Sequence, residues 1–551
     1  MKQTFLSLFS ILLLAGCVKE ELNLSNINSD TFNPSFALPV ASARLQVGRI
    51  NESGNRFLEV NPTTGILEFS YLSEAFRVGF SDIYQVNSQA FNTSVGMPSG
   101  TVSTFNASAL GTSATFSASN TAAITVPGPE LLDSIIVQNG NLNIALSSGF
   151  AHTTSVTLTI PSLVRNGIPF SAVIPLTYSG TVPVSATLSA SIDGYTVDLT
   201  DAGTATNTVR FNYSVAITRG ATPVTGTESI DFNFSLGLNR VDRAFGYFGN
   251  TVKTDNDTVE FDLFGNLFGG TLSFANPRME FTIINTTGVD IDADFTSVSA
   301  PENTIIQNIA GPGLTAIPTI VAAASIGDST ITSHLIDNSN TSPSISQLMN
   351  EKPSKFAFAT RFQFNPSGFT QNFITQNSKI EAQSKLVIPL DLYGSDFALS
   401  DTNNSDIEDV FGISEQDAEN IDKITLRLNV TNRLPIEAGL QVYFADNLNG
   451  IIDSLFDAGT QMILNGATVN FSVPVTDPNY GKAISAENNT LDIIMTQAKY
   501  VKLIQAGSEK IIFKASINTV DAALMKYVKI FPEDYIDIKV SAKLDLNVVI
   551  K

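Results

Sequence analysis

Few side chains in this sequence could act as nucleophiles, bases or soft metal ligands. Cys17 is the only cysteine, and His152 and His334 are the only histidines among 551 residues. Neither histidine lies beside a Ser-Gly elbow or a second ligand at helical spacing, as a catalytic triad or a zinc site would require. A single thiol also cannot form a disulfide within the chain. The sequence therefore predicts no catalytic residues, no metal site and no cofactor.

Carboxylates are more numerous, and two kinds of chemistry could use them. A glycosidase needs only two at a suitable separation, so a glycoside hydrolase stays as the less favoured alternative to a protein that is not an enzyme. The segment 401–409 (DTNNSDIED) has oxygen ligands at a spacing similar to that of a calcium loop. That loop needs a glycine where Asp406 stands and a glutamate where Gly412 stands. We therefore expect a solvated linker here rather than a calcium site.

The N-terminal residues have the pattern of an export signal. Lys2 supplies a positive charge, and Thr4–Leu14 is an uncharged run with eight Leu, Ile or Phe residues, too short to span a bilayer. The run leads into Leu14-Ala15-Gly16-Cys17, which resembles the bacterial lipobox. This resemblance implies that the signal peptide is cleaved after Gly16. It also implies that Cys17 carries a thioether-linked lipid and that its new amino terminus is acylated, for example with palmitate.

Charged residues follow the anchor cysteine almost directly. Lys19, Glu20 and Glu21 together resemble the surface-export signal of lipoproteins in the Bacteroidota. The resemblance implies an outer-membrane lipoprotein whose body faces the cell exterior. The alternative is a solvated polar tether that only keeps the body off the headgroups and leaves it on the periplasmic face. The most apolar later run, 317–326, is short and contains Pro318, so the lipid is the membrane attachment that we expect.

The net charge and the aromatic content of the chain disfavour two classes of binding partner, nucleic acids and glycans. The chain has 31 Lys and Arg against 52 Asp and Glu, a net charge of −21. It therefore repels phosphate backbones, and we expect no binding to nucleic acid. Its 37 Phe and its lack of Trp disfavour a glycan-binding module, because sugar faces commonly stack on flat aromatic rings, of which Trp is the preferred one. The 12 Tyr residues leave such a module open as an alternative.

Alternation of apolar and polar residues is the strongest structural signal. In Ser229–Leu238, Lys355–Phe364 and Ile536–Ile550, apolar residues occupy nearly every second position. This period is typical of half-buried strands. Clusters of Gly, Pro, Asn, Ser and Thr separate such runs, which indicates short turns between antiparallel strands.

Helical spacing is confined to a few short segments. Residues 344–351, 451–458 and 520–527 could each form about two turns, with Ser344 and Asp521 as N-caps. The sequence therefore predicts an all-β fold of tandem antiparallel β-sandwich domains with a few short connector helices.

The chain also repeats itself at a spacing of a sandwich domain. Met279–Phe295 aligns without gaps on Ile424–Leu440, and Val137–Leu142 can be laid on Phe274–Met279. We expect these segments: a signal peptide at 1–16, a tether at 17–31, an N-terminal β region at 32–129, and sandwiches at 130–250, 251–400 and 401–551.

Two further resemblances concern pattern rather than activity. Asn276-Pro277, followed by two alternating strands around an Asn-Thr-Thr-Gly turn, is similar to the β-sandwich domains of the late-embryogenesis-abundant and water-stress class. The segments 34–40, 246–249 and 426–456 look like those of large lipoproteins of the Bacteroidota for which no activity is established. We therefore expect a lipid-anchored structural or accessory protein that docks a partner in the envelope. The alternative is a surface lipoprotein that binds a glycan, a lipid or a protein cargo.

Overall fold

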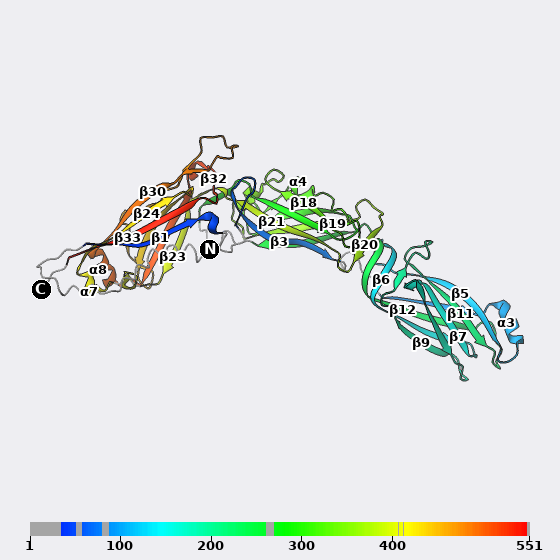
Figure 1. Ribbon diagram of the computed structural model, residues 1–551. Coiled ribbons are helices and arrows are strands. Elements are labelled where there is room, and N and C mark those ends of the chain that lie inside the picture. The colour runs from blue at the N-terminus through cyan, green and yellow to red at the C-terminus, as the bar shows by residue number, and fades with distance from the viewer. Residues whose placement is uncertain are drawn as a thin grey trace.

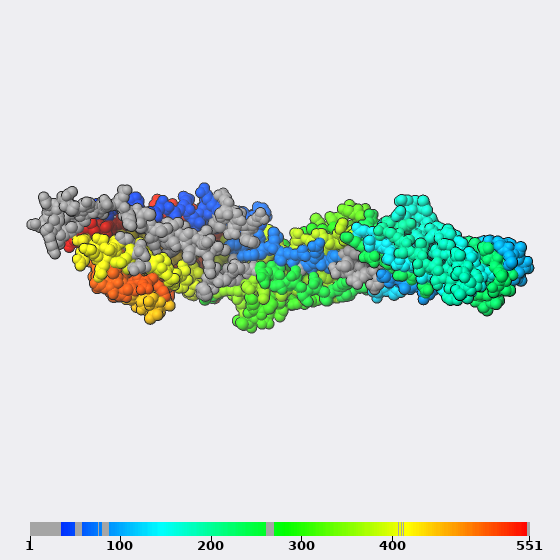
Figure 2. All heavy atoms as spheres, turned by 90° about the horizontal axis from the view of Figure 1, so that it is seen from below, coloured from blue at the N-terminus to red at the C-terminus, as the bar shows by residue number. Residues whose placement is uncertain are grey.

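The protein is a row of three β bodies. The computed structural model describes residues 35–50, 58–79, 88–260, 269–405, 407–411 and 413–547. Figure 1 shows these bodies following one another along a long axis, and Figure 2 shows the same elongated outline from a perpendicular direction. No helix in these ranges is long and apolar enough to cross a bilayer. The all-β architecture of packed antiparallel sheets with few short helices agrees with the prediction.

We name the bodies by their distance from the chain ends. The distal body contains β4 (Gln89–Gly96), α3 (Ser99–Ala107), β5 (Ser113–Ala123), β6 (Leu131–Ser148), β7 (Thr154–Arg165), β8 (Ile168–Leu176), β9 (Val184–Ser191), β10 (Thr196–Asp198), β11 (Thr208–Thr218) and β12 (Ser229–Tyr247). The middle body contains β2 (Leu58–Val60), β3 (Leu67–Gly79), β13 (Val252–Glu260), β15 (Arg278–Asn285), β16 (Ile291–Ser299), β17 (Asn308–Ile309), α4 (Pro312–Thr315), β18 (Thr330–Ile336), α5 (Ile345–Met349), β19 (Lys355–Phe364) and β21 (Lys379–Pro389). The short strand β20 (Asn372–Thr375) pairs with β12 and so joins the middle body to the sheet of the distal body.

The proximal body holds the first and the last described strands. It contains β1 (Ser35–Gln46), the 3-10 helix η1 (Val47–Ile50), β23 (Phe397–Asn403), α6 (Ile407–Phe411), α7 (Glu415–Ala418), β24 (Ile421–Asn432), β25 (Ile436–Ala445), β26 (Ile451–Ser454), β27 (Gln461–Leu464), β28 (Thr468–Val469), β29 (Ala483–Ser485), β30 (Glu487–Thr496), α8 (Gln497–Gln505), β31 (Lys510–Thr519), η2 (Ala522–Leu524) and β33 (Tyr535–Leu546). A small sheet of β14 (Thr271–Phe274), β22 (Asp391–Ser395) and β32 (Val528–Lys529) joins it to the middle body.

The chain visits the bodies outward and then returns through them in reverse order. It passes the proximal body as β1 and the middle body as β3, builds the distal body from β4 to β12, and comes back. In each body the outgoing strand pairs antiparallel with the last returning strand: β1 with β33, β3 with β21, and β4 with β12. The distal body is therefore nested within the middle body in sequence, and the middle body within the proximal one.

The three bodies share one strand order, which makes them structural repeats. One layer runs β1-β33-β24-β30 in the proximal body, β3-β21-β15-β18 in the middle body and β4-β12-β6-β9 in the distal body. The facing layer runs β23-β31-β25, β13-β19-β16 and β5-β11-β7 in the same three bodies. Each body is thus a two-layer sandwich whose inner faces bury alternate side chains.

A buried polar corner marks the same point in the repeats. Asn285 closes β15 by accepting the Thr287 N–H at 2.8 Å and donating to the Val289 carbonyl at 2.9 Å. Asn432 closes β24 in the same way with Leu434 and Ile436, each at 2.8 Å. The spacing of 147 residues between these two corners corrects the ungapped alignment, which placed Met279 on Ile424.

The correction has a simple cause. A shift of two residues keeps every apolar side chain on the same face of a strand, so alternation cannot fix the register. The other alignment holds, because Ser148 at the end of β6 lies 137 residues before Asn285, the same spacing that separates Val137 from Phe274. Ser148 Oγ accepts the Phe150 N–H at 3.2 Å, as the asparagine corners do for the second residue after them.

Two sequence expectations differ from the structure. Strands from the segment 32–129 lie in all three bodies, whereas we expected one N-terminal region, because their pairing partners lie between 133 and 510 residues away in the sequence. The segment 451–458 begins with strand β26 rather than a helix, since short apolar runs fit both periods. The helix at 344–351 is confirmed as α5, which Ser344 caps through Gln347. Residues 520–527 form only the short 3-10 helix η2.

Candidate functional site

The predicted anchor lies outside the described residues. Gly16, Cys17, Lys19, Glu20 and Glu21 all precede Ser35, the first residue that the structure describes. Ser35 itself stands opposite Asp545 in the β1–β33 pair, two residues before the last described residue. The predicted tether therefore joins the described chain at the outer end of the proximal body.

Both histidines take part in hydrogen bonds with the backbone of their own body. His152 is buried in the distal body beneath α3, with its ring 5.3 Å from that of Phe105. Its Nδ1 accepts the Gly220 N–H at 2.9 Å, and burial lowers its pKa below the usual value. The Nε2–H of His334 on β18 donates to the Gly313 carbonyl of α4 at 2.6 Å. The two rings lie in different bodies, so they form no joint site.

Acidic residues do not assemble into a metal site within the described ranges. No group of three His, Cys, Asp or Glu side chains there could hold a metal ion. Asp401, which opens the calcium-like segment, lies in β23 and is paired with Phe513, while Asp406 and Gly412 lie outside the described residues. Of the segment 401–409, residues 401–403 belong to β23 and residues 407–409 to α6.

Two buried carboxyl groups near the junction of the middle and proximal bodies have raised pKa values. Burial raises the pKa of Asp391 to about 6, although Lys529 lies opposite it in the β22–β32 pair. Burial also raises the pKa of Asp534 to about 6, against the effect of its bond from the Phe531 N–H at 2.8 Å. In both groups the largest cause of the raised pKa is burial in the packed junction.

The distal body differs from the rest of the chain in its surface chemistry. Residues 88–247 contain five Arg, eight Asp or Glu and no Lys, and the sequence has no Lys between Lys19 and Lys253. The outward positions of β5, β11 and β7 are mostly Ser, Thr and Asn, and they line a hollow of about 420 Å³. This face is therefore polar and almost uncharged.

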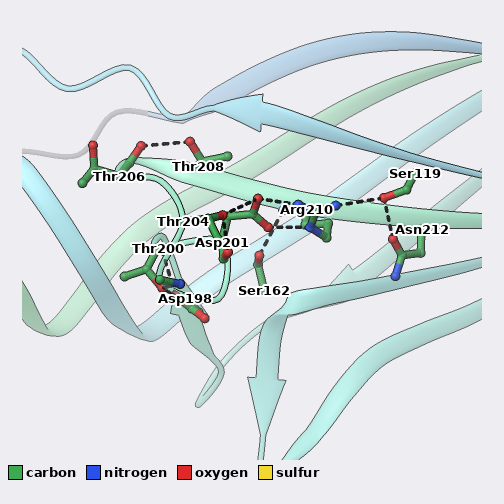
Figure 3. A network of polar contacts seen from close by, with 11 residues as sticks. Ser119, Ser162, Asp198, Thr200, Asp201, Thr204, Thr206, Thr208, Arg210 and Asn212 are labelled. Atoms are coloured by element: carbon green, nitrogen blue, oxygen red, sulfur yellow. Dashed lines mark hydrogen bonds and ion pairs between the residues drawn. The ribbon is translucent and has the colours of Figure 1, made fainter.

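The one arginine on this face is neutralised. Arg210 on β11 forms a two-pronged ion pair with Asp201, whose carboxylate oxygens lie 2.5 Å from its Nε and Nη2. Its Nη1 reaches Ser119 on β5 at 3.3 Å, and Ser119 donates to Asn212 at 2.9 Å. Figure 3 shows Arg210 stretched between Asp201 and Ser119. The guanidinium lowers the pKa of Asp201, so the pair stays ionised and fixed.

A second hollow lies where the two layers of the distal body come together at one edge. We call it the β4–β5 seam, because β4 and β5 form the edges of the two layers there. Its volume is about 480 Å³. Its lining comes from β4, β5 and β11: Phe91, Asn92, Thr93, Ser119, Asn120, Thr121, Ala122, Arg210, Phe211 and Tyr213.

Aromatic core residues come close to the surface at the seam. Phe91 on β4 is only half-buried, and its ring centre lies 4.8 Å from that of Phe211 and 5.2 Å from that of Phe234. Tyr213 is buried behind them, and its hydroxyl has no hydrogen-bond partner among the described residues. Sequence reasoning missed this seam. The uncharged run 88–129 was the available signal.

Comparisons with known proteins leave the chain without a family. No family model matches it, and no curated protein matches it. Among solved structures, a candidate secreted protein from Parabacteroides distasonis aligns over 93% of this chain and 99% of its own, with 9% identity and a TM-score of 0.25.

Two virus structures give weaker likenesses. One is described by the triple jelly roll fold and turret assembly of an archaeal virus, and the other is Sulfolobus turreted icosahedral virus. They are 12% and 13% identical, cover 79% of this chain and 90% and 91% of their own, and have TM-scores of 0.11. Scores at this level carry no argument about fold or function.

Proposed function

We propose that this chain is a lipid-anchored structural or accessory protein of the outer membrane, not an enzyme, that holds its distal body away from the bilayer to dock a partner. The observation that carries the proposal is the position of the first and last described strands, β1 and β33 (Figure 1). Ser35, which follows the predicted tether, lies beside the end of β33, and α3 lies at the opposite end of the row of bodies (Figure 1). An anchor at Cys17 therefore attaches the base and leaves the distal end free.

The length of the protein and its net charge both favour an arrangement in which the distal body stands away from the membrane. Strands of about ten residues span roughly 33 Å, so three bodies in a row reach on the order of 100 Å. The net charge of −21 repels anionic headgroups and so works against the body lying on an anionic membrane. Two or more acyl chains give durable attachment, whereas a single chain is marginal.

The lipid anchor would favour partner binding by raising the effective concentration of the protein near its partner. A protein confined to the membrane plane meets a partner in the same envelope at a high effective concentration, so modest contacts suffice. The partner that we propose is an envelope protein rather than a nucleic acid, which the negative charge repels. The body faces outward in this proposal, because residues 19–21 resemble a surface-export signal.

The lipid anchor is tested by metabolic labelling with an alkyne palmitate analogue. Wild-type protein should incorporate the label and fractionate with the outer membrane. Cys17→Ala should lose both properties and keep the circular dichroism of a folded β protein. Ser25→Ala, in the same tether, is the matched control and should behave as wild type. Label on Cys17→Ala, or none on wild type, contradicts the proposal.

A further inference from the structure

The β4–β5 seam separates two strand edges to which the described residues supply no partner strand. The large sheet of the distal body runs continuously from β4 through β12, β6, β10, β7 and β11 to β5. Within the described residues, β4 pairs only with β12 and β5 pairs only with β11. The sheet therefore curls until its two edges face each other without closing. Edge strands present a row of free backbone N–H and C=O groups, which is a template for another strand.

Side-chain amides bridge the seam where backbone pairing would otherwise lie. Gln89 at the start of β4 donates through Nε2 to the Thr125 carbonyl at 3.1 Å and accepts the Thr125 N–H through Oε1 at 2.8 Å. Asn120 on β5 donates through Nδ2 to Thr93 Oγ1 on β4. Side chains thus join the two strands in place of a ladder between their backbones. The seam is closed at one end and at one point along its length.

The seam lacks the features that usually protect edge strands. Proteins blunt exposed edges with Lys or other charges, with Pro, or with bulges. No charged residue occurs from 88 to 129, neither strand contains Pro, and both pair with their single neighbours without a register shift. The edge strand β13, by contrast, carries charges from Lys253 to Glu260, and the edge strand β8 contains Pro169 and Pro175.

We propose that the seam receives an extended, uncharged segment of a partner protein, which pairs with β4 and β5 and completes the sheet. Strand addition of this kind draws its affinity from backbone hydrogen bonds and its specificity from alternate side chains. Apolar side chains of the segment face Phe91 and Phe211, and small polar ones face solvent beside Asn92. The inference deepens the proposed docking role by naming the surface and the kind of partner.

A reversible staple across the seam tests the inference. In a chain with Cys17→Ala, the changes Thr93→Cys and Asn120→Cys supply the only two thiols, on side chains that already meet. Oxidation, or a short thiol cross-linker, then locks the seam shut, and reduction or omission of the linker leaves it open. A random library of twelve-residue peptides is selected on the open form, and the same library is screened against the locked form.

The enriched peptides should alternate apolar and uncharged polar residues. They should bind the open form and the unmutated seam at least about 10-fold more tightly than the locked form, because locking excludes the backbone pairing. Asn92→Lys on β4 should weaken binding by a similar factor, whereas Thr187→Lys on the edge strand β9 is the matched control and should not. Circular dichroism confirms that each variant is folded.

Three results overturn the inference. The first is a set of peptides that binds the open and locked forms equally. The second is binding of a neutral polysaccharide on a glycan array that the staple abolishes while no peptide binds. The third is self-association of the chain that the staple abolishes, which would make a second copy the occupant. None of these results bears on the anchor, because Cys17→Ala labelling is measured separately.

Discussion

Substitution of the two corner asparagines, Asn285 and Asn432, tests whether the middle and proximal bodies are true structural repeats. Asn285 is fully buried and takes part in hydrogen bonds with four groups: the N–H and hydroxyl of Thr287 and the carbonyls of Val289 and Val321, all at 2.8–3.1 Å. Asn432 bonds the Leu434 N–H and the carbonyls of Ile436 and Asn465 at 2.8–2.9 Å. Each side chain thus bonds three backbone groups, one N–H and two carbonyls.

The loss on truncation can be worked from these bonds. Asn285→Ala leaves the buried Thr287 N–H without a partner, which costs about 1–3 kcal/mol. It also removes one donor from each of the Val289 and Val321 carbonyls, at about 0.5–1 kcal/mol each, although the hydroxyls of Thr287 and Thr330 still donate to them. We expect a loss of about 3 kcal/mol, and the same for Asn432→Ala. For a cooperative unit of about 150 residues this lowers the melting temperature by roughly 6–12 °C. The middle body should respond to the first change and the proximal body to the second.

Differential scanning calorimetry on the unlipidated chain measures both effects, and hydrogen exchange assigns each lowered transition to a body. Asn488→Ala is the control: Asn488 is exposed and accepts one bond from Thr431, so it should cost at most about 0.5 kcal/mol. Losses below about 1 kcal/mol at both corners would refute the reasoning. A large loss at one corner and none at the other would refute the equivalence of the repeats.

Three further predictions concern sidedness and pH. Replacing residues 19–21 by alanine should protect the body from proteinase added to intact cells without releasing it from the outer membrane; wild-type protein that resists such proteinase would place it in the periplasm. Because burial raises the pKa of Asp391 to about 6 from 3.8, wild type should lose up to about 2–3 kcal/mol relative to Asp391→Asn as pH rises from 4 to 7, and a pH-independent difference in urea unfolding would contradict this. Glu351 accepts hydrogen bonds from the N–H groups of Thr304, Ile305 and Ile306, which lower its pKa to about 2. Wild type should therefore have a higher melting temperature than Glu351→Gln at pH 5, and this difference should disappear as the pH falls towards 2.

Local signals in the sequence predicted the strands but not their partners. Alternation identified β12, β19 and β33, because each buries one face and each pairs along its length. The nested order of the bodies could not be predicted from the sequence. The paired strands β1 and β33 lie about 500 residues apart, and an alternating pattern does not indicate which other strand it pairs with.

The candidate sites show the same division. Cys17 stood out by its type and position alone, whereas the β4–β5 seam exists only because a sheet curls far enough to bring two edges together. The uncharged run 88–129 is visible in the sequence, but its meaning depends on the strands being edges. A charge-free strand in the centre of a sheet would carry no such implication.

Projection of the distal body from the membrane is the central claim, and one measurement tests it directly. Cys17 is the only cysteine, so after lipidation an introduced cysteine is the sole site for a thiol-reactive fluorophore. Asp422→Cys lies on β24 beside the end of β33, and Leu110→Cys follows α3 and is 70% exposed. Lipidated protein in vesicles with acceptor-labelled lipids should show strong energy transfer from position 422 and none from position 110. Equal transfer from both positions, or transfer from position 110 alone, would contradict the account.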